Sequence, residues 1–387
     1  MVDQASLQLA LSREDTGLDV GAFVQILSKT TNSYKYLFLL GLLNRIHHTP
    51  PNQPITIPLA DMAIDMATLA WYPCRYFKLS FGATDQLPQL LLAVGANVST
   101  RKHGAEVLEH IRSEIQKHVD TNHLAATLLR YVPFRLLRPF FRSALRHEPD
   151  TRVDRLVAQR LRDGEDTLNP AIYTLRGESN RPVDLTLHLN PRWRILIARW
   201  HSVIYNWVLY EWAKYLQARN PTMPNVLGKL LPPDRRNQTQ LKKVKGFWIN
   251  FLEHQSVTCA YTSEKIDPRD FELDHFLPWS YVSHNLPWNL IPSTPSANSS
   301  KGAKLPDESY IEALARRQHL ALNYAYKHMT QTEWSELTMS YCHDLRLDQV
   351  GLLNAELLGT AYQQTMRPQI SLGKQLGFEA DWIYTTG

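Results

Sequence analysis

A carboxylate and an imidazole stand side by side at Asp274 and His275, and Asn289, Asn298 and Lys301 follow at short distances. An imidazole takes up a proton near neutral pH and can activate water. Carboxylate and amide oxygens suit a hard divalent cation, and a lysine ammonium suits a phosphate group. Hydrolysis of a phosphodiester needs activated water and stabilisation of charge on the phosphoryl oxygens. This set of residues therefore points to phosphodiester hydrolysis.

Local sequence signals predict two strands and a helix around these residues. Residues 271–277 are apolar and strand-like, and residues 289–291 indicate a short second strand. Thr294 can cap a helix in which Pro295 takes the first position. Asn298 then falls in the first turn, and the residue three positions later shares its face.

From these elements we assign His275 as the general base, and Asp274 and Asn298 as ligands of Mg²⁺ or Mn²⁺. Neighbouring residues of a strand point to opposite faces, so the metal must lie near the strand edge or the strand must bend. Lys301 and Lys304 are candidate contacts to the phosphates of a nucleic acid, with solvated helix residues as the alternative.

The spacing DH-x13-N-x8-N-x2-K and the following GAKLP resemble the HNH, or ββα-metal, nuclease motif. They are most similar to the HNH domain of RNA-guided CRISPR effector nucleases. The resemblance covers about residues 259–306, and the rest of the chain is not recognised. It implies that His275 is the base, that Asp274 and Asn298 bind the metal, and that Asn289 holds the loop and orients the histidine. It also implies products with a 5′-phosphate and a 3′-hydroxyl.

The 387 residues are 44% hydrophobic and 20% charged, which is typical of a globular protein with a sizeable core. A formal charge of +5 fits a polyanionic partner without requiring one. Cys74, Cys259 and Cys342 form no CxxC pair, so we expect neither a disulfide framework nor a structural zinc. The longest apolar run, residues 36–43, is too short to cross a membrane, and no leader is evident. We therefore expect a cytoplasmic protein with no membrane association.

The predicted fold class is a mainly α multidomain protein with an embedded ββα-metal nuclease module. Residues 181–190 alternate as a half-buried strand does, and a long aromatic helix over residues 193–216 follows the cap Asn190 and Pro191. Four regions are predicted: a helical region over 1–165 with an arginine-rich segment, a strand, aromatic helix and proline-rich connector over 166–240, the nuclease module over 241–306, and a helical region over 307–387.

The arginine-rich segment is the most one-sided charge cluster in the chain. It contains Arg130, Arg135, Arg138 and Arg142, interleaved with aromatic residues. Such a pattern is found where a protein follows a nucleic-acid backbone and stacks bases on aromatic rings. A solvated helix face over an aromatic core is the slightly preferred explanation.

The leading hypothesis is a metal-dependent HNH endonuclease that cuts duplex or single-stranded DNA, in bacterial restriction or anti-phage defence. About 250 residues precede the nuclease, so we expect control by them or by a targeting protein, a regulatory protein or a guide complex. One alternative is a nucleic-acid-binding or assembly subunit in which the HNH fold mainly docks. Another is an RNA-cleaving toxin with the same chemistry. A homo-oligomer is compatible with each hypothesis.

Overall fold

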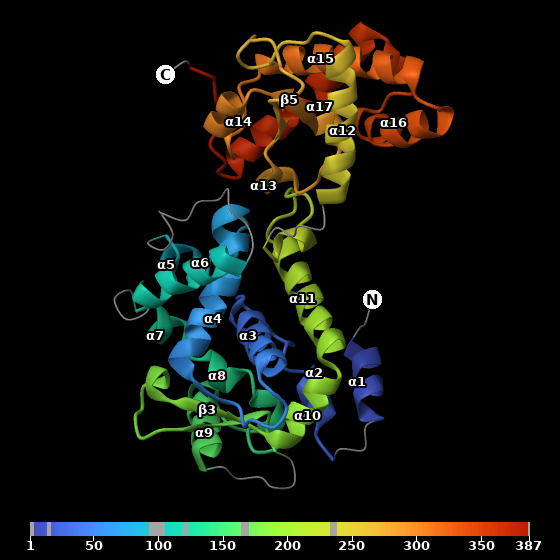
Figure 1. The fold of residues 1–387 in the computed structure, drawn as a ribbon. Coiled ribbons are helices and arrows are strands. Elements are labelled where there is room, and N and C mark those ends of the chain that lie inside the picture. Colours follow the sequence, from blue (N-terminus) through green and yellow to red (C-terminus); the bar gives the residue numbers. More distant parts are fainter. Residues whose placement is uncertain are drawn as a thin grey trace. The chain divides into compact units, whose positions relative to one another are not determined.

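A computed structural model describes residues 4–13, 17–92, 105–118, 123–163, 170–232 and 238–385 (Figure 1). The chain divides into two compact units. Unit 1 contains Met1–Pro221 and Val226–Pro233, and unit 2 contains Thr222–Asn225 and Asp234–Gly387. Both units are mainly helical, as the predicted fold class requires.

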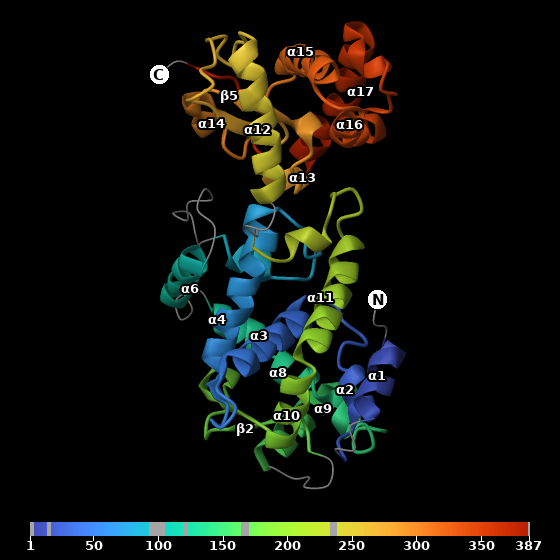
Figure 2. The same ribbon diagram turned by 45° about the vertical axis from the view of Figure 1, so that its right-hand side comes forward.

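Unit 1 is built around a buried helix. Its α-helices are α1 (Gln4–Ser12), α2 (Val20–Val24), α3 (Tyr34–His48), α4 (Leu59–Trp71), α5 (Leu87–Leu90), α6 (Ala105–His118), α7 (Leu124–Leu129), α8 (Val132–Arg135), α9 (Asp150–Asp163), α10 (Pro191–Arg199) and α11 (His201–Gln217). Helix α3 lies between α4 and α11 (Figures 1 and 2). Its apolar run, residues 36–43, is buried along its whole length, because neighbouring helices cover every side of α3.

A small antiparallel sheet completes unit 1, with the strand order β1-β3-β2. The strands are β1 (Thr56–Pro58), β2 (Tyr173–Arg176) and β3 (Thr186–Leu189). The strand predicted over residues 181–190 is thus shorter, and Pro182–Asp184 form a 3₁₀ turn, η3, before it. Pro182 has no N–H to give to a ladder, which favours the turn.

The aromatic helix predicted over residues 193–216 is in fact two helices, because α10 ends and α11 begins at Trp200. Its predicted start is confirmed: Pro191 is the first helical residue, and the Asn190 side chain accepts hydrogen bonds from the two backbone N–H groups that follow it. Trp193 and Trp212 are fully buried, so these rings belong to the core.

The described part of unit 2 contains two strands among its helices. They are α12 (Gln238–His254), β4 (Glu272–His275), α13 (Trp279–Val282), β5 (Leu290–Ser293), α14 (Pro295–Lys301), α15 (Tyr310–His328), α16 (Gln331–Leu345) and α17 (Ala355–Gln375). The predicted strands and helix around Asp274 and His275 are present as β4, β5 and α14. The helical character predicted after residue 307 is also confirmed.

The helices after residue 307 hold the strand region in place. Gln318 of α15 donates to the Leu290 carbonyl at 2.8 Å, and the Tyr362 hydroxyl of α17 donates to the Trp288 carbonyl at 2.9 Å. Near the end of the chain, Pro306 and Trp382 form a parallel β-bridge. The predicted regions 241–306 and 307–387 therefore share one compact unit.

Within the part of the chain that the structure describes, no helix combines the length and the apolar character that crossing a bilayer would require.

Candidate active site

Strands β4 and β5 pair antiparallel, with Asp274 opposite Ile291 and His275 opposite Leu290. Because side chains alternate along a strand, Glu272 and Asp274 share one face of β4 and His275 lies on the other. Helix α14 packs against β4 and begins where the sequence predicts: the Thr294 hydroxyl accepts from the Ala297 N–H, and Pro295 is the first helical residue.

One face of α14 meets the acidic face of β4. The Asn298 amide nitrogen donates to the Glu272 carboxylate, and the Lys301 ammonium lies 3.0 Å from Asp274 Oδ1. Asn298 and Lys301 are three residues apart and therefore point the same way. The predicted register of α14 is thus present in the structure.

The Asp274 carboxylate is almost completely enclosed, with 3% of its side chain exposed. Its Oδ1 accepts from Lys301, and its Oδ2 accepts from the Tyr261 hydroxyl at 2.5 Å. Burial raises the pKa of Asp274, whereas the Lys301 charge and the Tyr261 hydrogen bond oppose that shift. Donors of the protein itself thus occupy both carboxylate oxygens.

Lys301 occupies neither of the positions predicted from the sequence, which are a phosphate contact and a solvated helix face. Its side chain is fully buried, and the ammonium also donates to the His275 carbonyl at 2.7 Å. A position facing a substrate phosphate does not agree with this enclosure; Lys301 instead joins α14 to β4. Lys304 is partly exposed, and its ammonium lies 3.3 Å from the Glu379 carboxylate.

His275 is half-buried, and its Nε2 lies 2.8 Å from Asn285 Oδ1. An amide oxygen only accepts, so Nε2 carries the proton, and Nδ1 is the basic nitrogen of the neutral ring. The pKa of His275 is lowered to about 4, mainly by burial, which the Asn285 hydrogen bond opposes and the nearby Lys301 charge assists. The ring is therefore neutral near pH 7, which is the form that can accept a proton.

No motif or spacing in the sequence points to Asn285, although this residue is the partner of His275. Asn285 is 4% exposed and lies between α13 and β5, just after Ser283, whose left-handed backbone conformation ends α13. The contact depends on how this loop returns toward β4. No periodic pattern or cap signal in the sequence indicates that return.

Asn289 is fully buried at the base of the same loop. Its Oδ1 accepts from the Leu277 N–H at 2.8 Å, and its Nδ2 donates to the Leu277 carbonyl at 2.9 Å. Its side chain thus replaces a backbone partner and closes the segment between β4 and β5. These contacts are the ones that a loop-holding asparagine requires.

Glu272 and Asn298 form the accessible pair of oxygen donors in this site. Glu272 is exposed and Asn298 is half-buried. The hydrogen bond to Glu272 uses the amide nitrogen of Asn298, so it does not involve the amide oxygen, which is the atom that would bind a metal. Hard oxygen donors of this kind fit Mg²⁺. Glu272 is not among the residues predicted from the sequence, although the two-residue period of a strand places it on the face of Asp274.

No three His, Cys, Asp or Glu side chains gather closely enough to hold a metal, as far as the described residues go. Mg²⁺ is often held by one or two carboxylates, with water and substrate phosphates as its other ligands. The donor chemistry of Glu272 and Asn298 fits that mode. Asp274 fits it only if its contact with Lys301 or with Tyr261 opens.

The predicted arginine contacts lie in unit 1. The Arg130 guanidinium lies over the Tyr131 ring, 4.9 Å from its centroid. Arg135 and Arg138 form ion pairs with Asp154, and Arg142 pairs with Asp19 at 3.3 Å.

The site lies within a part of the chain that matches a known family. Residues 259–307 match the family model described as HNH endonuclease, which confirms the HNH resemblance for this part of the chain. At the level of that family, the domain is a nuclease, and its substrate is a nucleic acid. No curated protein and no solved structure matches the chain.

Proposed function

We propose that the chain is a metal-dependent endonuclease that hydrolyses phosphodiester bonds of DNA. The observation that carries this proposal is the placement of His275. Its hydrogen bond to Asn285 leaves Nδ1 as the basic nitrogen, within a segment that matches the HNH endonucleases. A neutral, oriented imidazole is what a general base for water needs.

In this proposal, Glu272 and Asn298 would hold Mg²⁺ or Mn²⁺, and Asp274 would be a further ligand if its contacts with Lys301 and Tyr261 opened. The ion supplies stabilisation of negative charge on the phosphoryl oxygens. This role explains why oxygen donors gather on one face of β4 and α14.

The residues of the chain perform the proton transfer. His275 Nδ1 takes a proton from a water molecule, and the oxygen of that water bonds to phosphorus. The bond from phosphorus to the 3′-oxygen breaks, and that oxygen gains a proton from solvent. The products are a 5′-phosphate and a 3′-hydroxyl. Asn285 holds the imidazole, and Asn289 holds the loop that carries Asn285.

The biological setting that we propose is bacterial restriction or anti-phage defence in the cytoplasm. Unit 1 has its own core and supplies more than half of the chain, so it is the candidate for targeting or control. The similarity of the motif to guided CRISPR effectors makes a guide complex or a regulatory protein a candidate partner. Cutting both strands with one site per chain requires a homo-oligomer or successive nicks.

A substrate panel tests the proposal on the full chain. Plasmid DNA, single-stranded DNA and RNA are incubated with Mg²⁺, with Mn²⁺ and with EDTA. The variants are His275→Ala and His343→Ala, the second of which removes an imidazole that is 86% exposed on α16. The wild type and His343→Ala should cut DNA, whereas His275→Ala and the EDTA samples should not.

Other outcomes select the alternatives. Full cleavage by His275→Ala would exclude the mechanism. Cleavage of RNA alone would favour the toxin, and binding of DNA without cleavage would favour an assembly subunit.

A further inference from the structure

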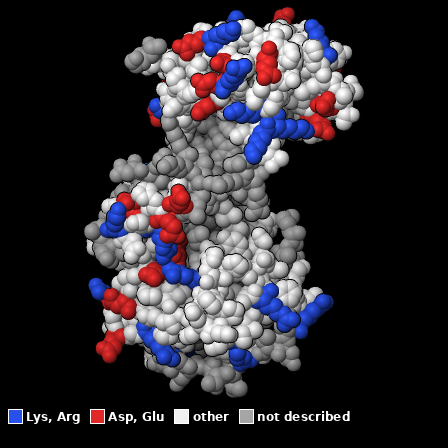
Figure 3. Space-filling view, in the orientation of Figure 1, with Lys and Arg blue, Asp and Glu red and all other residues white. Residues whose placement is uncertain are grey.

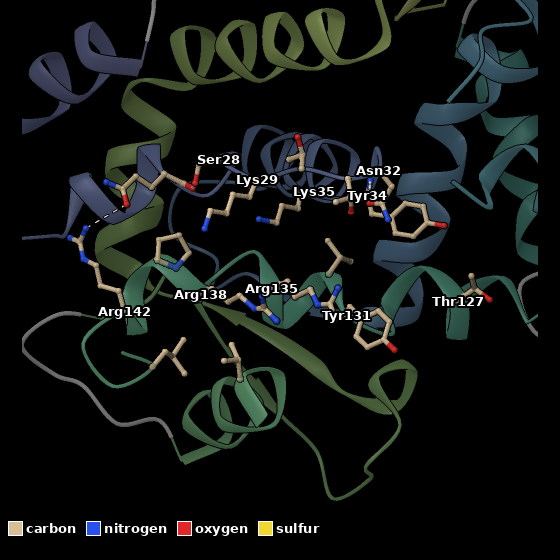
Figure 4. Close-up of a pocket in the computed structure, with 17 residues that line it drawn as sticks. Ser28, Lys29, Asn32, Tyr34, Lys35, Thr127, Tyr131, Arg135, Arg138 and Arg142 are labelled. Atoms are coloured by element: carbon tan, nitrogen blue, oxygen red, sulfur yellow. Dashed lines mark hydrogen bonds between the residues drawn. The ribbon is translucent and has the colours of Figure 1, made fainter. Parts of the chain in front are cut away.

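A cavity of about 610 Å³ lies in unit 1, between the start of α3 and the segment that contains α8 (Figure 4). Its walls bring together basic residues that are far apart in the sequence. In Figure 4, two lysines lie along one side of the cavity and three arginines along the other. These residues are Lys29, Lys35, Arg135, Arg138 and Arg142.

The charge of these walls has one sign. Among the described residues that line the cavity, none is acidic. Asp154 pairs with Arg135 and Arg138, and Asp19 pairs with Arg142. A guanidinium has five N–H donors in a planar fork, so the carboxylate partners of Arg135 and Arg142 orient these groups and leave donors for a second anion.

The two lysines of the cavity differ in burial and in backbone conformation. Lys35 donates to the Ile26 carbonyl at 3.0 Å, and its pKa is lowered to about 8, mainly by burial and in part by the charges of Arg138 and Arg135. Lys29 is exposed and adopts a left-handed backbone conformation, with φ at 63°, which lysine rarely does. An anion between the walls would relieve the mutual repulsion of these cations.

Neutral groups in the walls add hydrogen bonds and aromatic surface. Hydroxyl and amide side chains of the loop before α3 line the cavity, and the centroid of the Tyr131 ring lies 4.0 Å from the Arg135 guanidinium carbon. The loop groups are Ser28, Thr30, Thr31 and Asn32. A phosphate needs such donors, and a flat base or sugar ring can pack on an aromatic side chain.

We propose that this cavity binds a phosphorylated small molecule of nucleotide size. Its volume falls within the range of about 300–1,000 Å³ that is usual for small-ligand sites. A nucleic-acid strand would need basic residues along an extended path. Here they converge on one hollow, and on the face seen in Figure 3 basic and acidic side chains are interspersed.

Isothermal titration calorimetry on the full chain tests this site. The probes are ATP, pyrophosphate, inorganic phosphate and a short single-stranded oligonucleotide, all with EDTA so that nothing is cleaved. The first variant is Lys29→Asn, because asparagine tolerates the left-handed conformation and removes the charge. Its matched control is Lys78→Asn, which changes an exposed lysine with φ at 58° outside the cavity.

We expect ATP or pyrophosphate to bind the wild type, and Lys29→Asn to raise the Kd about tenfold, as the loss of one charge-assisted contact does. Lys78→Asn should leave the Kd unchanged. Arg142→Gln, which alters a half-exposed arginine, should also weaken binding, and a thermal melt shows that each variant is folded.

The inference is overturned if neither ATP nor pyrophosphate binds, or if Lys29→Asn and Arg142→Gln bind as the wild type does. Tighter binding of the oligonucleotide that is lost in the same variants would also overturn it, in favour of a nucleic-acid backbone site. The measurement contains no cleavage step, so its result is independent of the proposed nuclease activity.

Discussion

The Lys301 ammonium and the Asp274 carboxylate form an ion pair that is closed to solvent and joins α14 to β4. A buried pair stabilises little relative to an apolar pair, but removing one partner leaves the other charge uncompensated. The pair is therefore a structural element of the site, and its loss affects folding before chemistry.

Lys301→Met should lower the free energy of unfolding by about 3–5 kcal/mol, because Asp274 stays buried without its cation. Lys304→Met, at a partly exposed position, should change it by no more than about 0.5 kcal/mol. Urea denaturation of both variants measures the difference. Unchanged stability of Lys301→Met together with weaker DNA binding would restore the phosphate-contact assignment.

Asn285→Ala should lower the rate of cleavage at least about tenfold, because His275 loses the partner that fixes its tautomer and orientation. Asn285→Asp keeps an oxygen acceptor for Nε2–H and should recover most of the rate. Single-turnover cleavage and DNA binding, measured separately, show whether the loss is in kcat alone. Equal rates for the wild type and Asn285→Ala would rule out a positioning role.

Glu272→Gln should raise the Mg²⁺ concentration needed for half-maximal cleavage by about tenfold or more, because a neutral amide replaces a charged ligand. Glu264→Gln is the matched control, since this residue is exposed in the same unit. A titration of cleavage against Mg²⁺ compares the two. If only Asp274→Asn changes the Mg²⁺ requirement, the ion is held without Glu272.

Affinity of the unit 1 cavity for ATP should fall as the pH rises through about 8. The pKa of Lys35 in the folded protein is lowered to about 8, so its ammonium is charged below that value and neutral above it. Burial raises the pKa of Tyr34, which also lines the cavity, to about 12, well above this pH range. ATP suits this test because its terminal phosphate is already ionised.

Calorimetry about one pH unit below and above that value measures the change, and Lys35→Met should remove it. Persistence of the full pH dependence in Lys35→Met would assign it to another group.

The sequence predicts the strand, strand and helix of the site because their signals are local. Thr294 and Pro295 determine where α14 begins, and this in turn places Asn298 and Lys301 on one face. The spacing of residues in the sequence does not predict how deeply that face of α14 is buried. Packing of α14 on β4 encloses Lys301, so a residue that reads as a substrate contact is a buried structural one. Asn285 reaches His275 only through the path of a loop.

In unit 1, the sequence predicts helices well and strands poorly. Helix α3 is 15 residues long, whereas β1 and β2 are three and four residues long and pair with a strand ten or more residues away. Strands this short bury too few side chains for their alternation to stand out. The break at Trp200 has no proline or glycine to mark it. The four-region division of the chain stays a prediction.

The support that α15 and α17 give to the segment before and within β5 limits how this protein can be dissected. A fragment ending at residue 307 would keep every residue matched by the HNH family, yet the carbonyls of Trp288 and Leu290 would lose Tyr362 and Gln318. Without Trp382, Pro306 would also lose its partner in the parallel β-bridge. Truncation, fusion or grafting of the catalytic portion must therefore carry the chain through Trp382, and the recognisable motif is smaller than the piece that can fold around it.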